Sequence, residues 1–599
     1  MNEYKDERDI LEKDIKALEG KSATYSGVRF VMFLAALAGL IIGIYDNRVT
    51  VLILGIMAAV AFVAMVFIHG KLSEELEYKK AKSEVLRRYI ERFGDGWKKF
   101  EDNGAQYLGD DDLVARDMDL LGQSSLYQFI CVAGTEEGKR ALAESIRDPK
   151  YDIADIEKRQ EAIKELTSKR EFSMDFETLG VKTGMGKKKK YTADEFVAYC
   201  NGDDHIPAVF NILRFLLPAI TLVAFILGIM GEINIGWTLV SFFVVLLFSW
   251  LFGGVAGQAV MPMISFGYVI EDYIRMFELI SGENFDSELL NDIKSHLSND
   301  SGALAAIRKL RTISAAFNIR YNPIVHQILC GLIMWDFHIG RMMDKWKQKN
   351  GQSVEGWIKA VSDMEELMSF AVLSRTREVS YPQVGANARV HVTARDMRHP
   401  LISPDAVVAN DADFKGGATI ITGSNMSGKT TFLRTLGINL VLAYAGAPVC
   451  AGYMEADRMK IFTSMRVTDD VSNGISTFYA EILRIKTMVE YRKENRPMLC
   501  LIDEIFKGTN SADRIVGATQ VIRKLAGAGS MTLVSTHDFE LCDLKAEDGT
   551  PAANYHFEEY YEGDQLKFDY KKKDGRCTTT NAMAILHLSL IHISEPTRH

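Results

Sequence analysis

Four long uncharged stretches stand out from a chain that elsewhere mixes apolar and charged positions. Residues 30–45 and 49–68 contain no Asp, Glu, Lys or Arg, and only three residues separate them. A second pair covers residues 215–231 and, after Glu232, a run that is most apolar from 237 to 252. Each run approaches the roughly 20 residues that a helix needs to cross about 30 Å of hydrocarbon. The pattern therefore predicts two helical hairpins.

Two interpretations of these hairpins are open: membrane spans, or helices buried in a protein core. The runs are apolar on all sides, without a polar stripe at helical spacing, and their connecting turns are short. Both features favour membrane spans, because a helix on the surface of a water-soluble core keeps a polar face. The long charged segment before residue 30 and the lack of a small-residue cleavage site argue against a signal peptide.

Lys and Arg residues predict the orientation of the hairpins. The two turns that connect the paired runs contain a single basic residue, Arg48. The opposite flanks hold Arg29, Lys71, Lys79, Lys80, the run from Lys187 to Lys190, and Arg214. Because basic residues are retained on the cytoplasmic side, we expect a multi-pass membrane protein with both termini and all three hydrophilic regions in the cytoplasm. For the four-lysine run, a solvated loop, a lipid contact and a DNA phosphate contact are open alternatives.

The secondary structure predicted for the hydrophilic regions changes along the chain. Residues 1–26 and 71–95 are rich in Glu, Lys and Leu and lack Pro, which predicts helices that extend from the first hairpin. Residues 112–200 and 260–380 also have helical patterns, with Asn322-Pro323 as one break. From about residue 388, short β-branched strands alternate with glycine loops and helices, which is typical of an α/β domain with a mostly parallel sheet.

Composition limits the number of domains, the kind of DNA contact and the redox compartment that this chain can have. A chain of 599 residues with 47% hydrophobic residues exceeds one compact core, so several domains are expected. The net charge of −9 excludes an overall basic field, and any DNA contact must be local. The seven cysteines are scattered without a CxxC pair, which argues against a disulfide framework or a zinc site and favours a reducing compartment.

One motif carries recognisable chemistry. The stretch from Ala418 begins with an apolar strand and continues as a glycine loop that satisfies GxxxxGK[ST]. In this arrangement backbone N–H groups surround phosphate oxygens, Lys429 reaches the β- and γ-phosphates, and the Thr430 hydroxyl ligates Mg²⁺. The predicted ATP-binding residues are Gly423, Ser424, Asn425, Met426, Ser427, Gly428, Lys429, Thr430 and Thr431.

Two later strands complete the predicted ATPase site. The apolar run from Met498 ends in two carboxylates, of which Asp503 is expected to hold Mg²⁺ and Glu504 to activate the attacking water. A further strand ends in Ser535-Thr-His-Asp, where His537 is expected to sense the γ-phosphate. The alternative for each is a strand that ends in solvated polar groups, which the upstream glycine loop makes less favourable.

Together, these segments resemble the MutS family of ATPases. The resemblance rests on the glycine loop, on Arg398-His-Pro-Leu, on the segment Thr468-Asp-Asp-Val-Ser-Asn-Gly-Ile-Ser-Thr-Phe-Tyr-Ala-Glu, on Asp503-Glu-Ile-Phe-Lys-Gly-Thr-Asn and on Ser535-Thr-His. It is close over about 390–587 and looser over 112–200 and 260–380. It implies an ABC-type ATPase domain that forms a homodimer, with Ser476 and Thr477 of one subunit completing the other subunit's site. It also implies helical levers that move with ATP binding and hydrolysis and that clasp DNA in mismatch-repair members.

The chain also departs from that family. Mismatch-recognition members begin with a globular DNA-reading domain that carries a Phe-x-Glu wedge, whereas this chain begins with a charged helix and an apolar hairpin. The second hairpin interrupts the helices that resemble the family's core. Residues 588–599 match the translation of a sequencing-library adapter, and we interpret them as a non-native tail.

The expected fold class is multidomain, with an α-helical core and lever region, four transmembrane helices in two hairpins, and a C-terminal α/β P-loop ATPase domain. The expected segments are an N-terminal cytoplasmic helix (1–27), hairpin 1 (28–70), a helical core (71–205), hairpin 2 (206–256), a helical lever region (257–387), the ATPase domain (388–587) and the tail (588–599).

Three functions fit these expectations. The first is a membrane-anchored ATPase that uses ATP and Mg²⁺ to move levers bound to DNA or to a protein. The second is an ATP-driven transporter, which is disfavoured because no LSGGQ-like signature and no intramembrane acid or base is present. The third is a nucleotide-dependent membrane scaffold without a DNA ligand.

Overall fold

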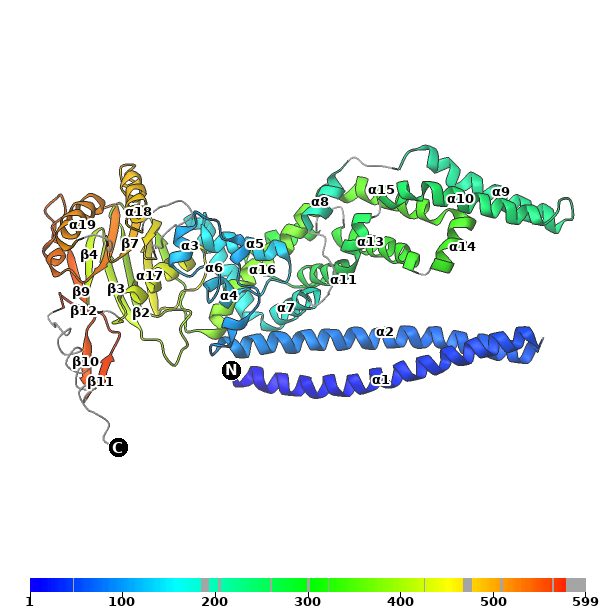
Figure 1. Cartoon of the computed structure of the whole chain (residues 1–599), viewed down its shortest axis with the longest axis horizontal. Helices are drawn as coiled ribbons and strands as arrows, with labels where there is room; N and C mark the ends of the chain where they lie inside the picture. Colours follow the sequence, from blue (N-terminus) through cyan, green and yellow to red (C-terminus); the bar gives the residue numbers. More distant parts are fainter. Residues whose placement is uncertain are drawn as a thin grey trace, which may run out of the picture. The chain divides into compact units, whose positions relative to one another are not determined.

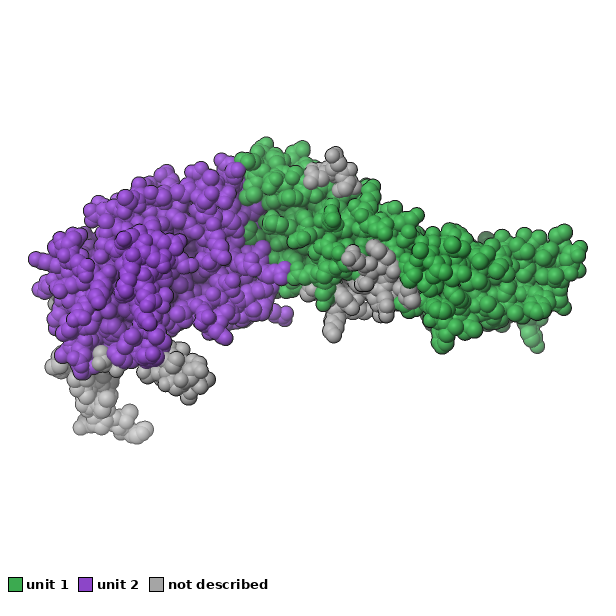
Figure 2. Space-filling model, turned by 90° about the horizontal axis from the view of Figure 1, so that it is seen from above, with its two compact units in different colours: residues 1–88, 132–139, 169–366 green, residues 89–131, 140–168, 367–599 purple. Residues whose placement is uncertain are grey.

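The computed structural model describes residues 1–46, 48–184, 193–202, 206–258, 261–298, 302–321, 323–424, 426–466, 477–506, 510–562 and 565–577. The chain divides into two compact units, coloured separately in Figure 2. Unit 1 comprises residues 1–88, 132–139 and 169–366, and unit 2 comprises residues 89–131, 140–168 and 367–599. Both units are therefore assembled from segments that are far apart in the sequence.

Unit 1 is built from helices (Figure 1). They are α1 (Asn2–Tyr45), α2 (Val49–Arg92), α7 (Arg170–Gly184), α8 (Ala193–Asn201), α9 (Val209–Ile229), α10 (Gly236–Gln258), α11 (Met261–Gly282), α12 (Glu288–Ser298), α13 (Ala303–Phe317), the 3₁₀ turn η3 (Asn318–Tyr321), α14 (Pro323–Ile333), α15 (Trp335–Asn350) and α16 (Val354–Thr376). Two helices cross the boundary between the units: α2 crosses it after Arg88, and α16 crosses it after Glu366.

The helices α1 and α2 form a long antiparallel hairpin (Figure 1). Each is a single helix of 44 residues, so the charged and the apolar parts of each are continuous. Glycines set the closest approach, because a Cβ on Gly39 would lie 2.6 Å from Gly55 Cα and one on Gly43 would lie 2.6 Å from Leu52 N. Small residues spaced four apart are typical of helices that pack closely in membranes.

Four helices are long and apolar enough to cross a membrane by length and composition. Their candidate spans are Asn2–Gly43, Val49–Arg92, Val209–Ile229 and Gly236–Gly254. Only 6–11% of the residues in their most apolar windows are buried, which differs from the burial expected of core helices. The structure therefore gives these side chains little protein to pack against within the described residues.

The remaining helices of unit 1 pack around α11 and α15. Within this bundle α10 contacts α9, α14 and α15, and α11 contacts α7, α8 and α13. Phe210 stacks on Phe337 with ring centroids 4.8 Å apart, which joins the start of α9 to α15. The carboxylate of Glu365 is buried and accepts hydrogen bonds from the backbone N–H groups of Gly134 (2.9 Å) and Thr135 (3.2 Å).

Unit 2 combines short helices with two sheets and a hairpin. Its helices are α3 (Leu113–Asp117), α4 (Leu126–Ile130), α5 (Glu136–Arg147, from Arg140), α6 (Ile153–Ser168), α17 (Lys429–Tyr444), α18 (Thr477–Arg492) and α19 (Ser511–Leu525). Its strands are β1 (Gln383–Gly385), β2 (His391–Met397), β3 (Asn410–Lys415), β4 (Gly417–Thr422), β5 (Tyr453–Asp457), β6 (Lys460–Ser464), β7 (Met498–Asp503), β8 (Ser530–Thr536), β9 (Ala553–His556), β10 (Glu559–Glu562), β11 (Gln565–Phe568) and β12 (Lys573–Asp574).

The larger sheet has the strand order β12-β9-β4-β8-β7-β6, and all its pairs except β12-β9 are parallel. The central strands β4, β7 and β8 are buried along nearly their whole length, and since successive side chains point to opposite sides, both faces of the sheet are covered there. Cys500 and Ile502 face a core that includes residues of α18 and α19. A Cβ on Gly437 of α17 would lie 3.0 Å from the Leu501 side chain, so α17 covers the other face. A smaller mixed sheet has the order β1-β5-β2-β3.

Candidate functional site

Three neighbouring parallel strands bring the predicted ATPase residues to one edge of the large sheet. The strand β4 pairs with β8, and β8 pairs with β7, with Thr422 opposite Thr536 and Asp503 opposite Ser535. The glycine loop therefore follows β4 where the two carboxylates follow β7 and where His537 follows β8. Ligands of open α/β sheets bind at this edge, beyond the carboxyl ends of the strands.

The glycine loop between β4 and α17 requires its glycines. Gly423 has φ 148° and Gly428 has φ 107°, which L side chains rarely adopt. A Cβ on Gly423 would lie 2.4 Å from the Phe557 carbonyl oxygen, so a larger residue would displace the backbone. Lys429 begins α17, and its ammonium donates to the carbonyl oxygens of Gly423 and Ser424 at 2.8 Å each. The loop thus gathers a cation and a helix N-terminus at one point.

The other loop residues differ in their surroundings. The Ser427 hydroxyl is buried and has no hydrogen-bond partner among the described residues, so it is a donor available to a phosphate oxygen. The Ser424 hydroxyl donates to Glu559 Oε2 at 2.6 Å. Met426 is 84% exposed and lies at the rim of the cavity beside the loop. Asn425 lies outside the described residues.

The two predicted magnesium ligands lie together. Thr430 Oγ1 donates to Asp503 Oδ2 at 2.9 Å, and the Ser535 hydroxyl donates to the other oxygen of the same carboxylate. A hydroxyl and a carboxylate are the oxygen ligands that Mg²⁺ prefers in proteins, usually with several waters and phosphate oxygens. The residues present therefore fit a magnesium ion at this position.

Glu504 is held in a strained turn directly after β7. It has φ 53°, and Phe506, two residues later, has φ 60°. Such values cost about 1–3 kcal/mol each and are concentrated at functional sites. Its backbone N–H donates to Ser535 O at 2.9 Å, and its Oε1 lies 3.0 Å from His537 Nε2. The predicted catalytic pair is thus in direct contact.

A cavity of about 470 Å³ lies beside the loop, with Thr430, Thr431 and Glu504 in its wall. Sequence reasoning did not predict most of this wall, which includes His399, Val407, Phe557 and Tyr570. Burial and the nearby Arg434 guanidinium lower the pKa of His399 to about 4, so its ring is uncharged at neutral pH. The only sequence signal for this wall was Arg398-His-Pro-Leu. Apolar and aromatic groups beside a phosphate loop suit a flat purine ring.

Of the two residues predicted to act across a dimer, the structure describes only the backbone of one, Thr477. Ser476 lies outside the described residues, and so does the side chain of Thr477, where α18 begins. The chain on either side of them is anchored by the buried Asp117, which sequence reasoning missed. Asp117 accepts from the Met465 N–H at 2.9 Å and from Arg484 at 3.0 Å, which ties the end of β6 to α18.

Comparison with known proteins agrees with this geometry. Residues 419–593 match the family model of MutS domain V, a span that begins in β4 and includes the glycine loop, Asp503, Glu504 and His537. A DNA mismatch repair protein MutS 2 of Haloarcula marismortui is 27% identical over 263 residues, which is 40% of this chain and 27% of that protein. Its counterpart in Halobacterium salinarum is 29% identical over 233 residues, covering 38% of this chain and 26% of that protein.

The chain thus spans about a quarter of the length of the curated relatives that it matches. The matched family model is that of an ATPase domain, and it covers the strands, the glycine loop and the paired carboxylates described above. Residues 419–593 of this chain therefore carry the ATPase domain of the MutS family.

Proposed function

We propose that this protein is a membrane-anchored ATPase in which Mg²⁺-dependent hydrolysis of ATP drives movement of the helical region. The observation that carries the proposal is the contact between Thr430 and Asp503, directly beside the pair formed by Glu504 and His537. These four side chains lie at one sheet edge next to a glycine loop, which is the arrangement that phosphoryl transfer needs.

Each residue has a distinct role in this proposal. The loop N–H groups and Lys429 bind the phosphates, and the cavity lined by Phe557 and Tyr570 takes the base. Thr430 and Asp503 would hold Mg²⁺, which neutralises charge on the phosphates when bound. Glu504 accepts a proton from the attacking water, and His537 keeps the carboxylate oriented through their 3.0 Å contact.

The membrane part of the proposal rests on the exposed apolar helices. In the α1–α2 hairpin and the α9–α10 hairpin, almost none of the apolar windows is buried by protein. Leaving so many large apolar side chains in water would be costly, whereas lipid would cover them. Basic residues lie at the ends opposite the hairpin turns, so the ATPase domain and both termini would face the cytoplasm.

Membrane fractionation and thiol labelling test this placement. The full chain is expected to resist extraction by alkaline carbonate and to need detergent. Tyr45→Cys and Asn234→Cys, at the two hairpin turns, are expected to react with an impermeant maleimide from outside the cell. Glu547→Cys, exposed in the ATPase domain, should react only after lysis. Release by carbonate without detergent would contradict membrane insertion.

We further propose that a DNA structure is the ligand of the helical region, without reading of mismatches. The proposal is supported by the two relatives, each named a DNA mismatch repair protein. Residues 2–92 form the α1–α2 hairpin, and the net charge of −9 requires that any DNA contact be local.

A binding experiment separates DNA binding from a scaffold role. Full-length protein in nanodiscs would be titrated with branched, mismatched and plain duplex DNA at two salt concentrations, with and without ATP. We expect ATP-dependent binding that weakens with salt and does not discriminate mismatched from plain duplex. Failure to bind any of the three DNAs, in a preparation that hydrolyses ATP, would contradict the DNA ligand and support a scaffold.

A further inference from the structure

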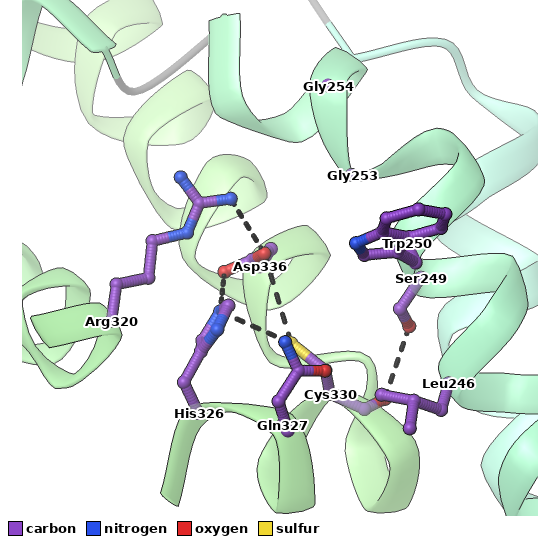
Figure 3. Close-up of a pocket in the computed structure, with 10 residues that line it drawn as sticks. All are labelled: Leu246, Ser249, Trp250, Gly253, Gly254, Arg320, His326, Gln327, Cys330 and Asp336. Atoms are coloured by element: carbon purple, nitrogen blue, oxygen red, sulfur yellow. Dashed lines mark hydrogen bonds and ion pairs between the residues drawn. The ribbon is translucent and has the colours of Figure 1, made fainter. Parts of the chain in front are cut away.

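A second cluster of reactive side chains lies in unit 1, whereas the nucleotide cavity is lined by residues of unit 2. Three potential metal ligands meet there: His326 and Cys330 on α14, and Asp336 at the start of α15. Their ligand atoms all lie within 4.8 Å of one another (Figure 3). Cys330 is 4% exposed, and the Asp336 side chain is 7% exposed.

The positions of the three residues follow from local structure. His326 and Cys330 are four residues apart on one helix, so both side chains lie on the same face. The chain then turns through Met334, which has φ 50°, and Asp336 follows in the first turn of α15. This turn brings the carboxylate back to the face of α14 that carries the other two groups.

The polarity of α14 is inverted relative to a helix in water. Val325, Ile328 and Leu332 are 42–47% exposed, whereas His326 and Cys330 face inward. A water-soluble helix normally buries its apolar stripe and exposes its polar groups. Burying an imidazole and a carboxylate is costly unless they find partners, and here the two groups lie within hydrogen-bond distance of each other.

The distances point to a shared cation. His326 Nε2 lies 2.9 Å from Asp336 Oδ1 and 3.3 Å from Cys330 Sγ, and Cys330 Sγ lies 3.9 Å from Asp336 Oδ2. One imidazole nitrogen carries either a hydrogen or a lone pair, so it serves only one of these two neighbours well. Ligand atoms around a tetrahedral zinc ion lie about 3.3–3.6 Å apart, given Zn–S of about 2.3 Å and Zn–N or Zn–O of about 2.0–2.1 Å.

The surroundings resemble those of a metal site with an open position. Arg320 donates to Asp336 Oδ2 at 2.8 Å, which fixes the carboxylate and leaves Oδ1 directed at His326. Such outer partners orient metal ligands. A cavity of about 390 Å³ lies against the cluster, and Gly253 and Gly254 of α10 form part of its wall (Figure 3). Among the described residues, no atom lies within 4 Å of where a Cβ would stand on either glycine, so this wall is open.

We propose that His326, Cys330 and Asp336 form a binding site for a zinc-class divalent cation, with the fourth coordination position facing the cavity beside α10. One histidine, one thiolate and one carboxylate suit a borderline-soft ion such as Zn²⁺ better than Mg²⁺ or Ca²⁺. The spacing of the cysteines gave no sign of this site. A search for paired cysteines misses it, because only one of its three ligands is a cysteine and the others are a histidine and an aspartate.

Metal analysis of the intact chain tests the site. Full-length protein, purified in detergent without a polyhistidine tag, would be loaded with Zn²⁺ or Co²⁺, passed through a desalting column and assayed for bound metal. We expect one equivalent of metal per chain. Bound Co²⁺ should give a thiolate-to-metal charge-transfer absorption and the strong visible bands of tetrahedral coordination.

Matched variants identify the ligands. Cys330→Ser, His326→Gln and Asp336→Asn are each expected to weaken metal binding by at least the 10–100-fold that loss of even an outer partner costs. Gln327→Ala, which is exposed, lines the same cavity and adjoins His326, should bind metal like the parent chain. Loss of metal in the control as well, or unchanged binding in all three ligand variants, would overturn the proposal.

A second measurement needs no variant. Bound Zn²⁺ should slow the alkylation of Cys330 in the parent chain, detected by peptide mass spectrometry, and should leave Cys131, a partly exposed thiol of the other unit, unaffected. A parent chain that takes up no metal and whose Cys330 is not protected would show that the cluster is a hydrogen-bonded brace between α14 and α15.

Discussion

Asp503 and Glu504 are neighbours in the sequence, but the structure gives their carboxylates different partners. Asp503 ends β7 in extended conformation and accepts from two hydroxyls, those of Thr430 and Ser535. Glu504 turns into a left-handed conformation and meets His537 instead. The turn therefore separates the proposed metal-binding carboxylate from the proposed proton-accepting one.

Replacing Glu504 tests that separation. Glu504→Gln is expected to keep ATP binding and to lower hydrolysis by about 10²–10⁴-fold, because an amide retains the shape but cannot accept a proton. Lys429→Ala should instead weaken nucleotide binding. Steady-state hydrolysis and binding of a fluorescent ATP analogue measure the two effects.

The matched control for this prediction is Glu547→Gln, which changes an exposed carboxylate of the same domain and should leave both measurements unchanged. Hydrolysis by Glu504→Gln at the rate of the parent chain would remove Glu504 from the reaction.

Glu365 gives unit 1 a distinct pH dependence. Burial raises its pKa from 4.5 to about 7, although the hydrogen bonds from Gly134 and Thr135 favour the charged form. Between about pH 4.5 and 7 the folded chain therefore holds a proton that the unfolded chain has lost. This contribution to stability is full below pH 4.5 and is lost as the pH rises through 7.

The expected result is that unfolding by urea in detergent becomes easier from about pH 5 to about pH 8, by up to about 3 kcal/mol from this group. Glu365→Gln should flatten the dependence, because an amide does not titrate. Glu355→Gln, exposed on the same helix, should follow the parent chain. Identical slopes for Glu365→Gln and the parent chain would show that Glu365 does not carry the effect.

At the scale of elements, the α1–α2 hairpin depends on glycines at its contact. Gly39→Ala would place a methyl group 2.6 Å from Gly55 Cα and should destabilise the hairpin by about 1–3 kcal/mol, the usual cost of overpacking. Gly27→Ala, on the same helix with no atom within 4 Å, should be neutral or stabilising by up to about 1 kcal/mol. Thermal unfolding followed by circular dichroism compares the two, and equal effects would contradict close packing at Gly39.

The elements that the sequence predicted are those with strong local signals. The apolar runs correspond to α1, α2, α9 and α10, and the glycine loop connects a strand to a helix as its spacing required. The helix α14 was not singled out, because its 11 residues are too few for a span and its exposed apolar face resembles an ordinary core stripe. Asp117 gave no signal either, since its partners Met465 and Arg484 are about 350 residues away.

The nucleotide cavity shows the same limit. The loop and the two carboxylates carry chemistry in their spacing, so they could be assigned from the sequence. Phe557 and Tyr570 reach the cavity only because the segments after β8 fold back towards the loop. Their positions depend on sheet topology, which no local pattern encodes.

For the whole molecule, the homodimer that the resemblance to the MutS family implies predicts complementation. If each site needs Ser476 from the partner, a Ser476→Ala chain mixed with a Lys429→Ala chain forms heterodimers with one intact and one doubly damaged site. We expect the mixture to recover part of the ATPase activity that neither homodimer shows. Titrating one chain into the other while measuring hydrolysis tests this, and activity that only averages the two parents would contradict a shared site.

The helices of the first hairpin are long enough to extend well beyond the membrane. Each helix of 44 residues is about 66 Å long, roughly twice the thickness of the hydrocarbon layer. Under the proposed topology the charged half stands in water as a paired stem, joined by Lys79–Asp14 and Lys80–Glu19. At its base, Arg170 of α7 pairs with Glu3 and Glu7, roughly 30 Å from the lipid headgroups. Because headgroup charge is screened within about 8 Å at physiological salt, this end of the stem is electrically independent of lipid composition.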